Sequence, residues 1–116
     1  MPLFAWDSVQ KEQLNPKIWR KMVTGDKLTV AQIQIAKDGV VPMHQHENEQ
    51  MSYILEGALK FEIGGQEVVV RKGEIVQIPA NVPHSAVALE DTFDIDIFTP
   101  VRKDWLTGRD DYLRKG

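Results

Sequence analysis

The sequence predicts an all-β domain, and two features support this fold class. From Trp19 to Pro100, short apolar runs are interrupted by Gly, Pro, Asn or Asp about every eight to twelve residues, a rhythm typical of β-sandwiches and barrels. Helical patterns are scarce, with single turns expected only over 9–15 and 102–106. The chain of 116 residues has the size of one domain, so we expect a single domain over 1–116.

Each expected strand lies between turn residues. The first strand places Ala31, Ile33 and Ile35 on one face, because side chains alternate along a strand. Gly64 and Gly65 follow the third strand, and their freedom at positive φ suits a tight hairpin. The expected strands are 29–36, 52–55, 58–63, 66–70, 75–78, 84–89 and 92–99. The polar tail from Thr107 to Gly116 is expected to be loosely held.

Composition excludes several classes of protein. With 42% hydrophobic and 27% charged residues, the chain is neither disordered, collagenous nor a coiled coil. A net charge of −3 without a basic cluster argues against a nucleic-acid partner. The absence of cysteine excludes disulfides, thiolate metal sites and a cysteine nucleophile, and fits a reducing compartment. Neither a signal peptide nor a membrane-length apolar run is present, so we expect a cytoplasmic protein without membrane partners.

The three histidines of the chain suggest a metal site. His44 and His46 are two residues apart, so on a strand both imidazoles point to the same side. Gln50 follows with an amide oxygen, and His84 comes from a distant strand. This donor set suits a transition metal, although the spacing alone is also compatible with surface histidines.

The surrounding residues resemble the first motif of the cupin superfamily. In that motif, Gly and five residues precede His-x-His, then three or four residues lead to Glu, and six more to Gly. Here Gly39 and four residues precede His44 and His46, then three residues lead to Gln50 and six more to Gly57. The main departure is Gln50 in place of Glu, which leaves the full charge on the ion. Glu49 remains open as an alternative donor, although neighbouring strand residues face opposite sides.

A second stretch resembles the other cupin motif, which runs Gly, five residues, Pro-x-Gly, two residues, His, three residues, Asn. Here Gly73 is followed by Pro79, Asn81, His84 and Ala88 at the same spacing. Asn81 replaces a turn glycine and tolerates the same left-handed backbone conformation. The resemblance implies a small cupin β-barrel, a double-stranded β-helix of jelly-roll type. It also implies one divalent metal ion with the ligands His44, His46, Gln50 and His84. Such a donor set leaves coordination positions open for water or substrate, as in catalytic sites.

The last expected strand carries a second cluster. Asp94, Asp96 and Phe98 share one face of it, and Arg102 follows Pro100. A solvated strand face would also explain these carboxylates. In a cupin barrel, however, the inward face of this strand lines the cavity, and Arg102 would reach over its mouth. There, Arg could pair with a substrate carboxylate and Asp could move a proton.

The run Asp96-x-Phe98-x-Pro100-x-Arg102 resembles the pectin-degradation cupins that open 4,5-unsaturated uronates. In that family a Gln ligand is the expected choice. The resemblance implies Asp96 as the catalytic residue, Arg102 and Phe98 as substrate-binding residues, and a sugar acid as substrate. The ion could be nickel, zinc, manganese or iron(II), since no redox change is needed. A non-haem iron dioxygenase and a non-catalytic metal- or sugar-binding cupin remain the alternatives.

The expected organisation has three parts: N-terminal strands over 1–35, a barrel core over 36–100 and a tail over 101–116. Small cupins commonly dimerise through N-terminal strands. We therefore expect a homodimer, and Trp19, Val23 and Val30 could form its interface.

Overall fold

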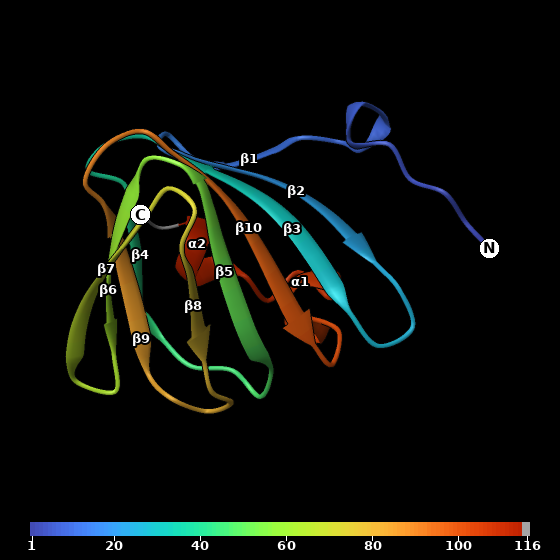
Figure 1. Ribbon diagram of the computed structural model, residues 1–116. Coiled ribbons are helices and arrows are strands. Elements are labelled where there is room, and N and C mark those ends of the chain that lie inside the picture. The colour runs from blue at the N-terminus through green and yellow to red at the C-terminus, as the bar shows by residue number, and fades with distance from the viewer. Residues whose placement is uncertain (115–116) are drawn as a thin grey trace.

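Two antiparallel β-sheets face each other around the core (Figure 1). The computed structural model describes residues 1–114. The six-stranded sheet has the order β1 (Glu12–Asn15), β2 (Ile18–Thr24), β3 (Thr29–Ile35), β10 (Thr92–Thr99), β5 (Glu49–Glu56) and β8 (Ile75–Ile78). The four-stranded sheet has the order β4 (Val40–His44), β9 (His84–Ala88), β6 (Ala58–Ile63) and β7 (Gln66–Arg71). The predicted all-β fold is confirmed. No helix within 1–114 is long and apolar enough to cross a membrane.

The turn chemistry of the sequence explains several of these boundaries. β6 has the predicted limits, and the hairpin to β7 turns through Gly64 and Gly65 at φ 55° and 82°. Asn81 adopts the expected left-handed conformation at φ 63°. Its amide donates to the carbonyl of His46 over 2.8 Å, so this turn joins the two loops that carry the histidines.

The N-terminal part differs from the prediction. Instead of a helical turn over 9–15, the chain forms a short 3₁₀ helix, η1 (Trp6–Ser8), and then β1, which pairs with β2. The sequence analysis expected N-terminal strands over 1–35 and a strand at the histidine pair, but it gave no limits for β1, β2 or β4. The strand conformation prevails because β1 directs Leu14, 5% exposed, into the core. A helix cannot pair with the edge of β2, so tertiary packing overrides the weak local preference.

The C-terminal tail is also better anchored than predicted. After the expected turn, now α1 (Lys103–Leu106), a second short helix, α2 (Asp111–Arg114), contributes Leu113 to the core. The guanidinium of Arg20, 1% exposed, donates to Asp110 over 2.9 Å and lies 4.4 Å from the centre of the Trp105 ring. The tail up to residue 114 is therefore tied to β2, while residues 115 and 116 lie outside the description.

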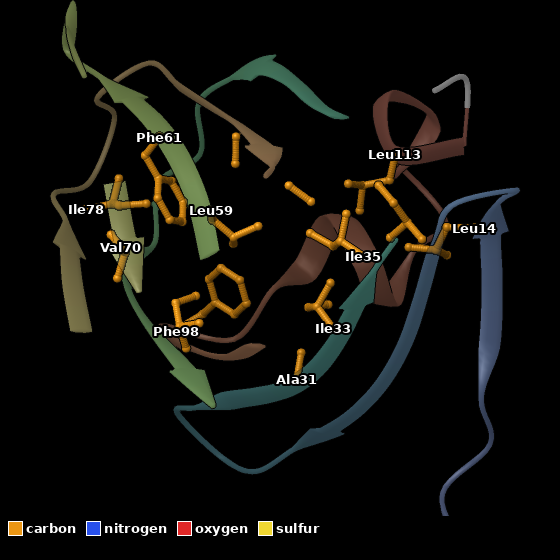
Figure 2. Packing of buried hydrophobic residues seen from close by; sticks show 14 of the residues in the cluster. Leu14, Ala31, Ile33, Ile35, Leu59, Phe61, Val70, Ile78, Phe98 and Leu113 are labelled. Carbon is orange, nitrogen blue, oxygen red and sulfur yellow. The ribbon is translucent and has the colours of Figure 1, made fainter. Parts of the chain in front are cut away.

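The core fills the space between the two sheets (Figure 2). Leu14, Ile35 and Leu113 lie near the C-terminal helices, while Phe61 and Ile78 lie at the opposite end. Phe98 occupies the region between these groups and is 1% exposed. Because β10 sits in the middle of the larger sheet, its inward side chains project into the same interior as the histidines.

Candidate metal centre

The three histidines gather where β4 and β9 pair. His44 ends β4 and is opposite His84 at the start of β9, with ring centroids 4.3 Å apart. His46 lies in the loop after β4 rather than on the strand itself, yet its ring centroid is 5.5 Å from that of His44. Candidate ligand atoms of all three lie within 4.8 Å of one another. The three side chains could therefore hold one metal ion.

Backbone carbonyls determine which imidazole nitrogen faces the centre. Nδ1 of His44 lies 2.8 Å from the carbonyl of Pro42, and the distance from His84 Nδ1 to the Val82 carbonyl is also 2.8 Å. His46 Nδ1 contacts the carbonyl of Asn48 at 3.0 Å. A carbonyl oxygen only accepts, so each Nδ1 must carry the proton. Each Nε2 is then left with a lone pair, which is the form that binds metal.

Burial keeps these imidazoles neutral. Burial, reinforced by neighbouring positive charge, lowers the pKa of His44 to about 3 and that of His46 to about 4. The pKa of His84 is lowered as well, again mainly by burial. At neutral pH the centre therefore presents deprotonated donors, so binding an ion does not require the release of protons from them.

Gln50 contributes the fourth donor from β5. Its side chain is 6% exposed, and Oε1 lies 3.1 Å from Nε2 of His46. With the His46 proton on Nδ1, two lone pairs face each other across this distance. Two donors that each lie about 2.1 Å from a shared ion, at right angles, are about 3.0 Å apart. Glu49 instead points outward and accepts a hydrogen bond from Gln77 over 2.8 Å.

The donor set therefore fits a divalent transition metal ion. Nε2 of His84 is buried and has no hydrogen-bond partner among the described residues, which would be costly in a site that never binds a ligand. Three imidazoles and one amide oxygen suit nickel, zinc, manganese or iron(II).

Two buried carboxyl groups lie beside the donors. Asp94 and Asp96 are 2% and 8% exposed and line the same cavity as Gln50 and His84. Burial, and then the neighbouring Asp96, raise the pKa of Asp94 well above its ordinary value. Burial also raises the pKa of Asp96, although hydrogen bonds from Asp94 and Ser52 oppose this shift. Of the two carboxyl groups, burial therefore favours the protonated form most strongly at Asp94.

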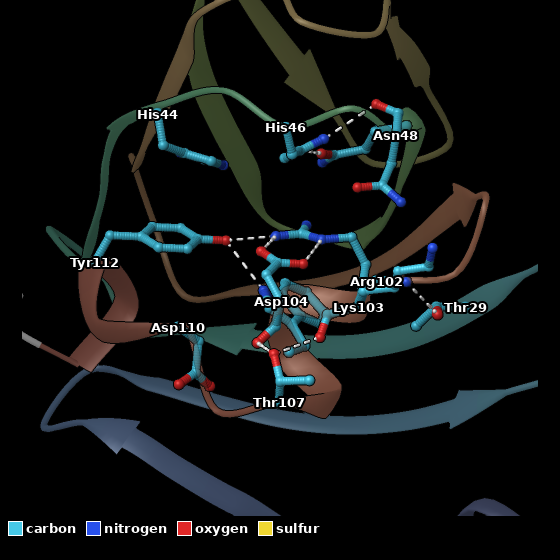
Figure 3. Close-up of polar contacts among 12 residues, drawn as sticks. Thr29, His44, His46, Asn48, Arg102, Lys103, Asp104, Thr107, Asp110 and Tyr112 are labelled. Atoms are coloured by element: carbon cyan, nitrogen blue, oxygen red, sulfur yellow. Dashed lines mark hydrogen bonds and ion pairs between the residues drawn. The ribbon is translucent and has the colours of Figure 1, made fainter.

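Arg102 lies inside the structure rather than over a mouth. It is 1% exposed, and its Nε and Nη2 donate to the two carboxylate oxygens of Asp104 over 2.9 and 2.6 Å (Figure 3). Its guanidinium lies against both Phe98 and Trp105, 4.6 and 4.1 Å from their ring centres, and these two rings also contact each other edge to face at 5.1 Å. Within residues 1–114, Nη1 of Arg102 forms no hydrogen bond, so this NH₂ group is available to donate to a ligand. Phe98 is covered by Arg102 and by the edge of the His46 ring at 5.7 Å.

Tyr112 belongs to this centre, although the sequence analysis assigned it no role. Its ring stacks on His44 with centroids 4.4 Å apart, and its hydroxyl accepts from Arg102 Nη2 over 2.8 Å (Figure 3). The same hydroxyl accepts from Trp105 Nε1 over 3.1 Å. No local pattern marks Tyr112, because its contacts depend on how the C-terminal segment folds back onto β4.

Two hollows adjoin the histidines. An internal cavity of about 50 Å³ is lined by Gln50, His84, Asp96 and Arg102, among others, and has room for an ion and a few waters. An outer groove of about 510 Å³ runs between His46 and the segment from Lys103 to Arg109. Small-molecule sites commonly measure about 300–1,000 Å³, so only the groove has that size.

Comparison with known families identifies the fold. Residues 31–98 match the cupin domain family, which covers more than half of the chain. The chain belongs to the cupins. This cupin is similar to the structure of KdgF from Halomonas sp., with a TM-score of 0.84, 30% identity and coverage of 90% of this chain and 98% of that one. A cupin from Shewanella frigidimarina described as RmlC-like gives a TM-score of 0.80 at 27% identity, covering 85% and 90% of the two chains.

Curated relatives add a second group. Human 3-hydroxyanthranilate 3,4-dioxygenase is 33% identical over 88 residues, which is 70% of this cupin but only 29% of the human protein. An uncharacterised protein of Methanocaldococcus jannaschii, MJ1618, is 30% identical over 78 residues, covering 66% of this chain and 59% of that protein. This cupin thus spans less than a third of the dioxygenase.

Proposed function

We propose that this cupin is a metal-dependent enzyme that opens the ring of 4,5-unsaturated uronate monosaccharides to give linear keto sugar acids. The observation that carries the proposal is the joint presence of three neutral imidazoles, a neutral amide and a buried acid pair around one cavity. The likeness to KdgF over nearly the whole of both chains supports it. The ligands are His44, His46, Gln50 and His84.

When bound, the divalent ion supplies Lewis-acid polarisation of substrate oxygens. Asp96 then acts as general base on the anomeric hydroxyl of the sugar, and the ring carbon–oxygen bond breaks as an aldehyde forms. The electron pair of that bond becomes an enolate, and the proton returns to the carbon chain to give the ketone. The reaction is an isomerisation, so it needs no oxidant, and its proton balance requires only one carrier.

Arg102 binds the substrate directly, whereas Phe98 acts through Arg102 and His46. Arg102 holds the uronate carboxylate with Nη1, since Nε and Nη2 are already bound to Asp104 and Tyr112. Phe98 supports Arg102 and His46 from behind, with its ring packed against both. The body of the sugar lies in the groove next to His46, because the internal cavity of about 50 Å³ is too small for a whole monosaccharide. Asp96 and Arg102 line the internal cavity rather than the groove, so the proposal requires the reacting end of the sugar to reach past His46 into that cavity.

The decisive experiment is turnover of a purified 4,5-unsaturated uronate, followed as loss of its ultraviolet absorbance. Elemental analysis of the same preparation identifies the ion, and chelation followed by readdition of single metals shows whether activity depends on it. Loss of absorbance that vanishes on chelation supports the proposal. An unchanged uronate in the presence of each candidate ion contradicts it.

A non-haem iron dioxygenase is the second candidate, favoured by the 33% identity to the human dioxygenase. It requires iron(II) and consumes oxygen, so an oxygen electrode separates it from the isomerase. A non-catalytic binding cupin would bind the uronate without consuming either the sugar or oxygen.

We also propose that the protein is a homodimer through the outer face of its larger sheet. Val23, Val30, Ile97 and Met51 are direct cross-strand partners and form one apolar row across four strands. Ile97 and Met51 are 40% and 43% exposed, and a continuous exposed apolar patch commonly marks an interface. Light scattering at micromolar concentration should give twice the chain mass, and Ile97→Glu should halve it. A monomeric mass for the unaltered protein contradicts the dimer.

A further inference from the structure

The Gln50 side chain presents a problem that a carboxylate ligand would not have. The two ends of an amide differ, because only the oxygen can bind a cation, while the NH₂ group is a donor without a free lone pair. A carboxylate offers two equivalent oxygens. A glutamine ligand therefore needs a neighbour that decides which end faces the ion.

Ser52 determines which end of the Gln50 amide faces the ion. Its side chain is fully buried on β5, and its hydroxyl donates to Asp96 Oδ1 over 2.6 Å. A serine hydroxyl has a single proton, and at this distance that proton is committed to the carboxylate. The hydroxyl oxygen is then available only as an acceptor. Gln50 Nε2 lies 2.9 Å from it and donates.

In the metal-free protein, the opposite orientation of the Gln50 amide would form a favourable hydrogen bond with His46. Gln50 Oε1 now faces His46 Nε2 across 3.1 Å, and both atoms carry lone pairs when the His46 proton is on Nδ1. A rotated amide would direct its NH₂ group at that lone pair and form a hydrogen bond instead. Without Ser52, the orientation that cannot bind an ion is therefore the preferred one.

The strand register holds this arrangement in place. Ser52 and Asp96 are direct partners in the ladder between β5 and β10. Across this ladder Asp96 accepts the proton of the Ser52 hydroxyl. A chain of hydrogen bonds thus links Asp96 through Ser52 to the Gln50 amide.

We propose that Ser52, held by Asp96, is a positioning residue that fixes the carbonyl end of the Gln50 amide toward the metal ion. The proposal rests on the metal site described under the proposed function. It explains how a neutral amide serves as an oxygen ligand, and it gives Asp96 a second role that does not depend on proton transfer.

A double-mutant cycle tests this proposal through metal binding alone. Cobalt(II) is the probe, with its affinity measured by competition with a chelator and its coordination followed by visible absorption. In the natural background, Ser52→Ala should weaken cobalt binding about 10–100-fold, the usual effect of losing a group that orients a ligand. In the Gln50→Glu background, the same substitution should change the affinity less than about threefold, because a carboxylate cannot be misoriented.

Two further variants make the cycle decisive. Ser85→Ala removes a serine hydroxyl from β9 beside His84, outside the hydrogen-bond chain Asp96–Ser52–Gln50, and it should leave cobalt affinity unchanged. Asp96→Asn changes the other end of this hydrogen-bond chain with nearly the same side-chain shape. The NH₂ group of the new asparagine can donate to Ser52, and the serine hydroxyl is then free to donate to the oxygen of the Gln50 amide. That amide would rotate and direct its NH₂ group at the ion, so cobalt binding should weaken only when residue 50 is glutamine. This arm answers the question even if Ser52→Ala does not fold.

The outcomes separate the two proposals. Loss of affinity confined to the glutamine background supports the positioning role. Equal losses in both backgrounds, or no loss in either, overturn it and leave the metal site standing. If the unaltered protein binds no cobalt at all, both the metal site and the role of Ser52 are refuted.

Discussion

Asp110→Ala is expected to destabilise the protein strongly, because it deprives the buried Arg20 guanidinium of its buried partner. Both residues are 1% exposed, and Arg20 Nη2 donates to Asp110 Oδ2 over 2.9 Å. Breaking a buried ion pair by removing one member costs about 3–5 kcal/mol. Glu12 still accepts from Arg20 at 3.1 Å, and Arg20 remains against Trp105, so we expect the lower end, about 3 kcal/mol.

Urea unfolding followed by tryptophan fluorescence measures this loss. In thermal unfolding, 1 kcal/mol corresponds to roughly 4 °C for a domain of this size, so Tm should fall by roughly 12 °C. The matched control is Glu56→Ala, which removes the partner of Lys72 from an exposed pair and should cost under about 1 kcal/mol.

A third variant isolates the cause. Arg20→Met combined with Asp110→Leu replaces the pair by apolar side chains and should recover most of the lost stability, because no unpaired charge remains buried. If Asp110→Ala costs no more than the Glu56→Ala control, then the Arg20–Asp110 pair does not anchor the C-terminal segment, and this reasoning is refuted.

Three further predictions concern the candidate site. At saturating metal, Asp96→Asn should lower kcat for the uronate about 10²–10⁴-fold, and an unchanged kcat would remove Asp96 from the chemistry. Arg102→Lys keeps the charge but loses the Nη1 arm, so steady-state kinetics should show a raised KM with a smaller change in kcat; an unaltered KM would contradict carboxylate binding by Arg102. Asp94 should make stability depend on pH, because burial raises its pKa in the folded protein above the ordinary value of 3.8. The unfolded chain then loses this proton first, and the stabilisation present below pH 3.8 is lost as pH rises toward the folded-state pKa. Between those two values, the free energy of unfolding of metal-free protein should fall relative to Asp94→Asn by roughly 1.4 kcal/mol per pH unit. If the urea midpoints of the two proteins instead run parallel from about pH 4 to about pH 7, Asp94 is ionised in the folded state.

The regular strands could be predicted because their patterns are local. In β6, apolar and charged residues alternate and two glycines follow, so the strand and its turn can be recognised from adjacent residues alone. β2 gives no such evidence. Its inward face includes Arg20, a charged residue that makes sense only beside Asp110, 90 positions later. A pattern of neighbours in sequence cannot reveal a partner at that distance.

The candidate site shows the same division. The spacing of the histidines and Gln50 predicted one cluster of donors, and the structure brings these side chains together. The environment of Arg102 could not be predicted, because Asp104 and Tyr112 reach it only after the C-terminal segment has folded back. Whether these residues act as proposed stays a prediction.

The carbonyls that orient the three imidazoles belong to the main chain, at Pro42, Asn48 and Val82. A residue keeps its carbonyl whatever side chain it carries. Substitutions in these loops therefore leave the facing nitrogen of each histidine unchanged, provided that the backbone follows the same path. Side chains along the neighbouring groove can therefore be replaced without changing which nitrogen each histidine presents, as long as the histidines and this backbone path are kept.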